Sequence, residues 1–388
     1  MKTLLEIFII SLRLGLTSFG GPVAHLGYFR EAYVHRRQWL SEKQYADLVA
    51  LCQFLPGPAS SQVGIGIGMA RGGTVGGFVS FIGFTLPSVL LLMAVAVGFQ
   101  QQGLIELGLV DGLKIVAVAV VAHALLGMGR NLAPDAKRAS IAVLSFVAVL
   151  LAPAVWMQVA VILAAGLIGW GLYRNADLPK AESLPLKLSA KFSAVCLTLF
   201  FSLLALLPIL RAATDSLHVQ LADSFYRAGA LVFGGGHVVL PLLEREVVPT
   251  GLLSESEFLA GYGAAQAVPG PLFTFASYLG MVIDGTAGAI TATAAIFAPA
   301  FLLLLGVLPL WLKLQQAPAM RAAAAGVNAG VVGILAAALY DPVFTSAITA
   351  SADLAFAALL FMLLMYWKQP AWLVVILGVL GGMLFYGG

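Results

Sequence analysis

Apolar residues run along this chain in long stretches that are separated by short polar loops. Most stretches approach the roughly 20 residues that a helix needs to cross a membrane. Strands of a membrane barrel would alternate apolar and polar residues, whereas runs such as 89–99 and 354–365 are apolar on every face. The stretches lie at 4–21, 45–70, 75–99, 104–128, 140–153, 154–173, 192–210, 225–243, 258–283, 285–312, 319–340, 354–367 and 372–386. The pattern therefore predicts an all-α polytopic membrane protein with about 10–13 membrane segments.

The composition strengthens this interpretation. Of the 388 residues, 61% are hydrophobic and 10% are charged, and the mean hydropathy is +0.98. A soluble domain has roughly 25% charged residues, and a globule of this composition would expose large apolar patches. The net charge of +3 comes without a long basic block, so we expect no nucleic acid partner. Cys52 and Cys196 form no CxxC motif and no Walker motif is present, so we expect no cofactor, no metal and no use of ATP.

Two parts of the chain repeat one another. The strings RLGLTSFGG and RAGALVFGG, which begin at Arg13 and Arg227, match at an offset of 214 residues. LSEKQY and LSESEF, and then QFLPGP and QAVPGP, follow in the same order at an offset of 213 residues. We therefore expect two homologous halves, 1–173 and 217–388, joined by a linker at 174–216 that carries one unpaired membrane segment.

The unpaired segment and the loop charges predict that the halves are inverted. An odd number of crossings between the two starts would turn the second half over relative to the first. Loop 30–43 holds four basic and two acidic residues, whereas its counterpart 244–257 holds one basic and four acidic residues. Basic loops face the cytoplasm, so these two loops belong on opposite faces of the membrane. We expect an inverted repeat with Gly/Pro-broken helices.

The strongest candidates for chemistry are the two Pro-Gly-Pro motifs. Proline cannot continue a helix but suits its first position, and we expect Pro58 to open a new helix there. The next amides would lack partners, and free amides at a helix start bind anions. The candidate site residues are Pro56, Gly57, Pro58, Ser60, Ser61 and Gln62 in the first copy, and Pro269, Gly270, Pro271 and Thr274 in the second. Interrupted helices at matching places of two halves are typical of a transporter site at the repeat interface. The alternative is a proline kink whose free groups are satisfied by neighbouring helices.

The Phe-Gly-Gly motifs and the arginines before them complete the candidate site. Paired glycines in an apolar helix indicate either close helix packing or an unwound stretch that lines a substrate path. An arginine inside a membrane segment is costly, and its fork suits an oxyanion. A salt bridge to Glu6 or to Asp223 is the alternative. The candidates are Arg13, Gly20 and Gly21 in the first half, and Arg227, Gly234, Gly235 and His237 in the second. Single histidines such as His25 could carry protons or merely join helices.

These residues resemble the chromate ion transporter family in its long, two-domain form. The resemblance rests on SFGGPVAHLGYF, WLSEKQY and LCQFLPGPASSQVGIGIG in the first half, and on LVFGGGHVVLPLLE and LSESEFLAGYGAAQAVPGPLFTFASYLG in the second. It implies a multi-pass protein of the inner membrane that exports chromate, driven by the proton gradient or by exchange with sulfate. No catalytic constellation is apparent, so we expect no enzyme activity.

The partners that follow are chromate, sulfate, protons and lipid, and a homodimer is compatible with them. A carrier for another oxyanion such as sulfate, or an anion channel, is the alternative.

Overall fold

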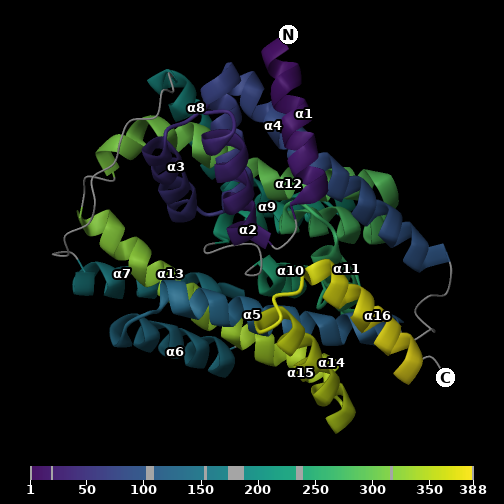
Figure 1. Ribbon diagram of the computed structural model, residues 1–388. Helices are drawn as coiled ribbons and strands as arrows, with labels where there is room; N and C mark the ends of the chain where they lie inside the picture. Colours follow the sequence, from purple (N-terminus) through teal and green to yellow (C-terminus); the bar gives the residue numbers. More distant parts are fainter. Residues whose placement is uncertain are drawn as a thin grey trace. The chain divides into compact units, whose positions relative to one another are not determined.

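The computed structural model describes residues 2–18, 21–101, 109–152, 155–173, 188–232, 239–314 and 318–386 (Figure 1). Every regular element in these ranges is a helix, which confirms the predicted all-α fold class. Up to residue 173 the elements are α1 Lys2–Thr17, α2 Gly21–Phe29, the π-helix η1 Arg30–His35, α3 Glu42–Phe54, α4 Ala59–Gln101, α5 Leu109–Leu132, α6 Ala136–Leu151 and α7 Val155–Tyr173. From residue 188 onward they are α8 Ala190–Ala213, α9 Leu217–Leu231, α10 Val239–Val247, α11 Glu255–Ala267, the 3₁₀ turn η4 Leu272–Thr274, α12 Phe275–Leu314, α13 Pro318–Ala338, η5 Leu339–Phe344, α14 Thr345–Ala347, α15 Ser351–Met365 and α16 Ala371–Tyr386.

Several of these helices are suited to cross a membrane. Within the described ranges, five stretches are long and apolar enough to span: Ala59–Phe99, Asp111–Arg130, Ala190–Ala213, Leu272–Trp311 and Arg321–Asp341. Shorter apolar helices cover Ala160–Tyr173, Ser351–Met365 and Leu373–Phe385. Their outer faces are apolar as well, since Leu163 and Phe201 are 65% and 62% exposed. Water does not favour such faces, whereas lipid does, so the chain is a multi-pass membrane protein.

The chain forms two compact units, and each unit draws on both halves of the sequence. Unit 1 contains α1, α2, η1, α3, α4 up to Met93, α8, α9, η4 and α12. Unit 2 contains the end of α4, α5, α6, α7, α10, α11 and the elements from α13 onward. In unit 2, α13 packs on α6 and α7, and α5 packs on α11, α15 and α16. Small residues bring these helices close: a Cβ on Gly169 would lie 2.6 Å from the Ala322 carbonyl oxygen.

In unit 1, α4 is a helical hairpin. Gly72 and Gly73 leave helical geometry, and Gly73 has φ +65°, which glycine adopts at little cost. The hairpin has a first arm at 59–71 and a second arm at 74–101, and the arms touch where Gly68 meets the Gly76 backbone. The Ser80 hydroxyl also donates to the Gly64 carbonyl across the arms, at 2.9 Å. Helix α12 leaves helical geometry in the same way at Asp284 and Gly285. The sequence predicted a break between two apolar stretches at each of these places, and the structure has one at both.

Helix α3 and the first arm of α4 also lie side by side in opposite directions. A Cβ on Gly66 would lie 2.7 Å from a methyl carbon of Leu48, and the two residues stand nine positions on either side of Gly57. At the other end of this pair the Arg71 guanidinium lies over the Trp39 ring, 5.2 Å from its centre. The first Pro-Gly-Pro motif therefore forms the tip of a hairpin about 20 Å long, which is less than the thickness of a membrane core.

Helices α1 and α2 form a second hairpin with η1. The Ser11 hydroxyl lies 3.1 Å from the Tyr33 hydroxyl, and nearer the tip the Ser18 carbonyl oxygen lies 3.2 Å from His25 Nε2. The polar ends of the two hairpins are tied by Arg30, which donates to Glu42 at 2.9 Å. This hydrogen bond holds the pKa of the Glu42 carboxyl below its ordinary value. Both hairpins thus start at one end of unit 1 and point their tips toward its interior.

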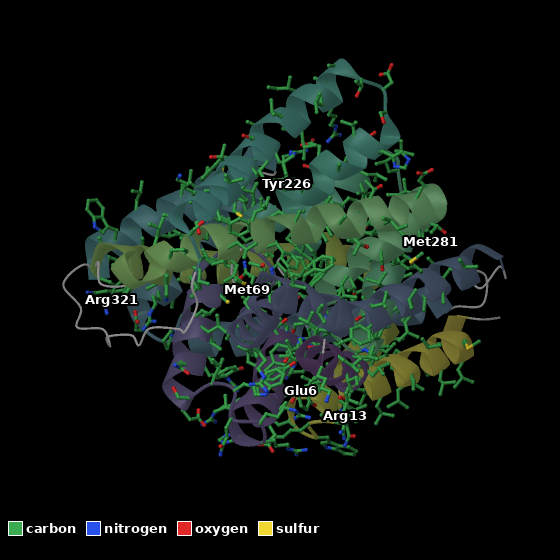
Figure 2. The ribbon with its side chains drawn as sticks, turned by 90° about the horizontal axis from the view of Figure 1, so that it is seen from above. Glu6, Arg13, Met69, Tyr226, Met281 and Arg321 are labelled. Atoms are coloured by element: carbon green, nitrogen blue, oxygen red, sulfur yellow. The ribbon has the colours of Figure 1, made fainter. Side chains whose placement is uncertain are left out.

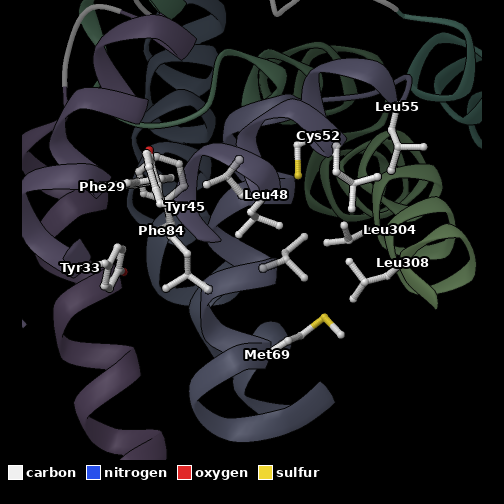
Figure 3. Packing of buried hydrophobic residues seen from close by; sticks show 14 of the residues in the cluster. Phe29, Tyr33, Tyr45, Leu48, Cys52, Leu55, Met69, Phe84, Leu304 and Leu308 are labelled. Carbon is white, nitrogen blue, oxygen red and sulfur yellow. The ribbon is translucent and has the colours of Figure 1, made fainter. Parts of the chain in front are cut away.

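The two halves of the sequence share one apolar core in unit 1 (Figure 3). Leu48 of α3 and Met69 of α4 belong to the same buried cluster as Leu304 and Leu308 near the end of α12. In the second arm of α4, Phe78 lies 6.1 Å from Phe301, and Phe81 lies 5.0 Å from Phe297, measured between ring centres. Residue numbers that increase along α4 thus pair with residue numbers that decrease along α12. The second arms of the two helices therefore run in opposite directions where they meet.

Candidate functional site

The first Pro-Gly-Pro motif is a tight turn between α3 and α4. Gly57 has φ +113°, which any side chain would disfavour. Gln62 fixes the turn, because its backbone amide donates to the Pro58 carbonyl and its side-chain Nε2 donates to the Pro56 carbonyl, both at 3.0 Å. The helix starts at Ala59 and Pro58 caps it, so the expected helix start at Pro58 was one residue too early. The broken helix itself is confirmed.

The second Pro-Gly-Pro motif has the same backbone. Gly270 has φ +101°, and the Thr274 amide donates to the Pro271 carbonyl at 3.0 Å. The Thr274 hydroxyl donates to that same carbonyl oxygen at 2.7 Å. Here the chain passes through the 3₁₀ turn η4 before α12 begins. The Thr274 hydroxyl therefore stabilises its own turn in this structure.

Each proline turn is seated on the opposite half of the sequence. The Gly57 amide donates to the Val232 carbonyl at 2.7 Å, and the Gly270 amide donates to the Ser18 carbonyl at 2.9 Å. Ser18 and Val232 are equivalent, since each directly precedes a Phe-Gly-Gly motif. All four residues belong to unit 1. The structure therefore brings the two turns and the starts of both glycine motifs into one interior.

A second reciprocal contact has the same symmetry. A Cβ on Gly57 would lie 3.6 Å from Cβ of Ala300, and a Cβ on Gly270 would meet the Ser88 hydroxyl oxygen. Ser88 and Ala300 are again equivalent, at an offset of 212 residues, in the second arms of α4 and α12. Glycine is favoured at both turns by the positive φ, and at Gly270 the close approach of Ser88 from the opposite half excludes a side chain as well.

Several buried polar groups near the two proline turns have no protein partner among the described residues. The first-turn amides of α4, on Ala59, Ser60 and Ser61, have no backbone acceptor in the described ranges, as expected of a helix start. The side-chain oxygens in the same situation are the hydroxyls of Ser18, Ser61, Thr85 and Ser88 and the Oε1 atom of Gln62. Each of these side chains is at most 3% exposed. Buried polar groups are nearly always hydrogen-bonded, so this cluster of amides and hydroxyls with one amide oxygen indicates a place for a ligand or for water.

The equivalent positions of the second half are almost all apolar. Ser18, Ser60, Gln62, Thr85 and Ser88 correspond in order to Val232, Phe273, Phe275, Phe297 and Ala300. Ser61 corresponds to Thr274, whose hydroxyl is bonded to Pro271. The polar groups of this interior therefore come from the first half, whereas the second half supplies aromatic rings.

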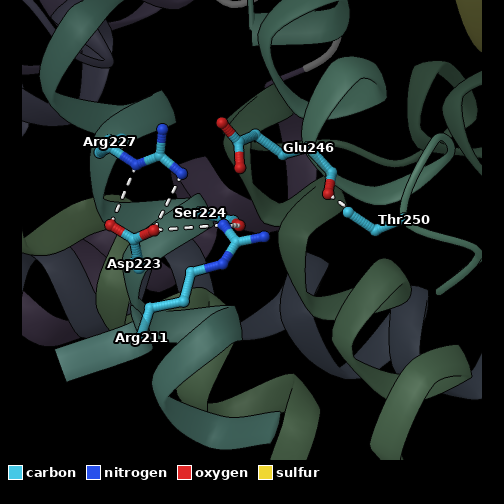
Figure 4. A network of polar contacts seen from close by, with 6 residues as sticks. All are labelled: Arg211, Asp223, Ser224, Arg227, Glu246 and Thr250. Carbon is cyan, nitrogen blue, oxygen red and sulfur yellow. Dashed lines mark hydrogen bonds and ion pairs between the residues drawn. The ribbon is translucent and has the colours of Figure 1, made fainter. Parts of the chain in front are cut away.

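The Arg227 side chain is engaged in a buried ion pair (Figure 4). Its Nε and Nη2 atoms donate to the two carboxylate oxygens of Asp223, at 3.0 and 2.9 Å. Arg211 of α8 donates to the same carboxylate at 3.2 Å and to the Ser224 hydroxyl at 3.1 Å. Asp223 is 1% exposed, and its buried carboxylate is compensated by the two guanidinium groups. The ion pair that the four-residue spacing allows is present, and anion binding by Arg227 stays a prediction.

The Arg13 side chain lies on an exposed face of α1 (Figure 2). Its neighbours on that face, Ile9 and Leu16, are 54% and 52% exposed. Glu6, the partner considered for Arg13, lies 3.5 Å from Arg71 instead. No ion pair of Arg13 is found within the described part of the chain. A role in binding the substrate stays a prediction for this residue as well.

Some candidate residues cannot be placed. Gly20, Gly234, Gly235 and His237 lie outside the described residues, and Gly21 is the first residue of α2.

The structure adds three residues that the motif analysis did not include in the site, namely Ser18, Thr85 and Ser88. An alignment of the halves at an offset of 212 residues pairs TLPS at 85–88 with FAPA at 297–300. This pairing would have shown that two polar residues of a repeated proline motif are replaced by apolar ones in the second half.

Comparison with known proteins identifies the family of the chain. The sequence model described as chromate transporter matches twice, at residues 5–170 and 219–383. The chain belongs to the chromate transporter family. This family consists of transport proteins and not of enzymes, and its double match makes the chain a two-repeat membrane protein.

Relatives within the chromate transporter family cover most of the chain. A chromate transport protein of Pseudomonas aeruginosa is 28% identical over 87% of this chain and 80% of its own length. A chromate transport protein of Cupriavidus metallidurans is 28% identical over 87% of this chain and 82% of its own length. An uncharacterized transporter of Methanocaldococcus jannaschii is 27% identical over 98% of this chain and 94% of its own length. No solved structure matches the chain.

Proposed function

We propose that this protein is a secondary carrier that exports chromate across the inner membrane, driven by the proton gradient or by exchange with sulfate. The assignment of chromate as the substrate rests on the family and on the names of two relatives, which are chromate transport proteins. The site that we propose lies where the proline turns and glycine motifs of both halves meet in unit 1. The observation that carries it is the reciprocal seating of Gly57 on Val232 and of Gly270 on Ser18.

The chemistry around the first turn suits a tetrahedral dianion. Such an anion accepts hydrogen bonds on every oxygen, and this interior offers amides and hydroxyls that have no protein acceptor among the described residues. The start of α4 adds roughly half a positive charge from the helix dipole. Donors without a fixed cation next to them bind a dianion by many moderate contacts, which permits both selection and release. Gln62 is better suited to hold the turn than to bind the anion, since its Nε2 already donates to Pro56.

The opposite direction of two equivalent helices supports an inverted repeat and, with it, alternating access. In unit 1 the second arms of α4 and α12 run in opposite directions, as Phe78 and Phe81 show by their order against Phe301 and Phe297. The polar loops 30–43 and 244–257 differ in charge sign as inverted halves require. In carriers of inverted repeats, one fixed site is opened to either side by small movements of the repeats. The repeat boundaries 1–173 and 217–388 and a homodimeric assembly belong to this proposal.

Uptake into inverted membrane vesicles tests the function. Vesicles that contain the protein should accumulate radiolabelled chromate, excess sulfate should compete, and an uncoupler should abolish the gradient-driven part. Vesicles without the protein are the control. Sulfate uptake without chromate uptake would replace the substrate, and chromate current without any counter-ion or gradient dependence would replace the carrier by an anion channel.

A further inference from the structure

A buried histidine joins the two hairpin tips of the first half. His25 of α2 is 1% exposed. Its Nε2 atom lies 3.2 Å from the Ser18 carbonyl oxygen at the end of α1, and its Nδ1 atom lies 3.3 Å from the Ser60 hydroxyl oxygen on the first turn of α4. The edge of the Phe84 ring completes the contact, with 5.4 Å between ring centres. Both ring nitrogens are thus engaged, at a position that touches the first proline turn.

The carbonyl decides which nitrogen carries the proton. A carbonyl oxygen can only accept a hydrogen bond, so Nε2 must donate to Ser18. A neutral imidazole has a single N–H group, and Nδ1 therefore has a lone pair and accepts. Among the described residues, the group in place to donate to it is the Ser60 hydroxyl. While His25 is neutral, the Ser60 proton points at His25 and away from any anion at the helix start.

Protonation of His25 reverses this hydrogen bond. A proton from water adds to Nδ1, which then donates to the Ser60 oxygen. The Ser60 hydroxyl hydrogen is released and can donate to another acceptor. Next to it lie the α4 amides without backbone acceptors in the described ranges and the Ser61 hydroxyl without a partner there. An anion held by these donors gains the Ser60 hydroxyl and a nearby positive charge in the same step.

We propose that His25 links proton binding to anion binding by setting the direction in which Ser60 donates. This inference rests on the proposed carrier function and adds a positioning residue to it. The second half has no such pair, because Val239 and Phe273 stand at the positions equivalent to His25 and Ser60. Each chain therefore binds one proton with one dianion at this site, and the complex carries one net negative charge.

No other charge competes for this role among the described contacts of the ring. The groups that touch His25 from α1 and α4 are a carbonyl, a hydroxyl and a phenyl ring. The other buried ionisable groups with hydrogen bonds along α2 and η1 are the phenols of Tyr33 and Tyr45. Tyr33 is bonded to Ser11, and Tyr45 donates to the Leu26 carbonyl at 2.6 Å. Phenols are neutral at working pH.

Binding of radiolabelled chromate to the purified full-length protein between about pH 5.5 and 8 tests the proposal. Chromate itself takes up a proton in this range, so the readout is the ratio of affinities between variants, from which that effect cancels. The variant His25→Gln keeps an N–H group for the Ser18 carbonyl but cannot be protonated. We expect the ratio of wild-type to His25→Gln affinity to rise as pH falls, by up to about tenfold per pH unit where His25 titrates.

Two further variants separate the mechanism from a folding defect. Ser60→Ala removes only the hydroxyl. We expect this variant to bind chromate more weakly than the wild type at low pH, and its chromate affinity to depend less on pH. His218→Gln is the matched control, since His218 of α9 is half exposed, 3.5 Å from Asp284 and away from the turns; it should follow the wild type at every pH. In weakly buffered solution, chromate binding should take up more protons with the wild type than with His25→Gln.

The outcomes are distinct. If wild type and His25→Gln share one pH profile, or if proton uptake is equal in both, the proton link is wrong while the carrier function stands. If His25→Gln fails to fold, Ser60→Ala decides alone, and an unchanged pH profile in that variant overturns the proposal. If the wild type neither binds nor transports chromate or sulfate at any pH, the proposed function itself fails.

Discussion

The helix start after Gly57 carries the hydroxyls of Ser60 and Ser61 next to a histidine, whereas the helix start after Gly270 carries the rings of Phe273 and Phe275. Their backbones are nonetheless alike: both glycines have φ near +100°, at +113° and +101°. Both amides donate to the residue before the opposite Phe-Gly-Gly motif. The Pro-Gly-Pro motif and the opposite carbonyl fix the backbone, and a few side chains on α4 and α12 fix the chemistry.

This difference teaches that symmetry and binding are separate properties of the fold. The symmetric backbone gives the two halves matching frames, as a carrier that opens to either side requires. The asymmetric side chains place the polar groups of this interior on the first half and aromatic rings on the second, so the first half provides the donors for an anion. The helices before the turns differ as well, since α9 has the buried Asp223 where α1 has the exposed Ile9.

The largest effect is expected from Asp223→Asn. The change leaves Arg211 and Arg227 facing a neutral amide in a buried place, and breaking a buried ion pair costs about 3 kcal/mol or more in unfolding free energy. Thermal unfolding of the detergent-solubilised protein measures it. The control is Asp284→Asn, whose partner His218 is half exposed, and it should cost less than about 1 kcal/mol. Equal melting temperatures for both variants would show that α9 is not held by this pair.

The next effect is expected from Gly270→Ala. Positive φ costs a non-glycine residue about 1–2 kcal/mol, and the new methyl group meets Ser88. Gly57→Ala carries the same backbone cost, but its closest contact is the side-chain end of Gln62 at 3.2 Å, a longer contact than that of Gly270 with Ser88, so it should lose less stability. Adding Ser88→Gly should recover part of the loss in Gly270→Ala and none in Gly57→Ala. If the double-mutant cycle of Gly270→Ala and Ser88→Gly shows no coupling in unfolding free energy, the close contact between Gly270 and Ser88 is contradicted.

A smaller effect is expected from removing single hydroxyls. Ser61→Ala and Ser88→Ala should each weaken chromate binding by about 1.5–3 kcal/mol, as expected for a hydrogen bond to a charged group, with little change in unfolding. Thr274→Ala, in the second half, removes a hydroxyl that donates to Pro271 and should leave affinity nearly unchanged. Binding of radiolabelled chromate compares the three. If Thr274→Ala weakens binding as much as Ser61→Ala, both halves contribute donors and the asymmetry has no functional meaning.

The smallest effect on stability is expected from Arg13→Lys. The side chain is exposed, so unfolding should change by no more than about 0.5 kcal/mol. Chromate transport then reports its role directly: if its fork binds the oxyanion, Lys should lose most transport at normal expression. Full transport by Arg13→Lys, or by the double variant Glu6→Gln/Arg13→Gln, would restrict Arg13 to a surface charge.

The sequence was sufficient for the features that local patterns encode. The repeated LSE strings predict equal elements, and both become helix starts in which Ser41 and Ser254 cap α3 and α11 with the same paired hydrogen bonds. The proline breaks also follow from local chemistry. The seating of each turn does not, because it depends on carbonyls far away in the chain, such as Val232 for Gly57. Arg211 was equally out of reach, since it comes from α8, which has no repeated counterpart to compare.

The reciprocal seating of the turns also sets an order of events during biosynthesis. The acceptor of the Gly57 amide is Val232, which leaves the ribosome 175 residues later, or roughly 9–35 s at ordinary rates of synthesis. Until then a buried amide in the membrane has no partner, and such a group is costly in lipid. The first half therefore has to wait in an incomplete state, exposed to insertion errors and to quality control. A truncated chain that ends before α9 should be degraded rapidly, and a second half supplied as a separate chain should protect it.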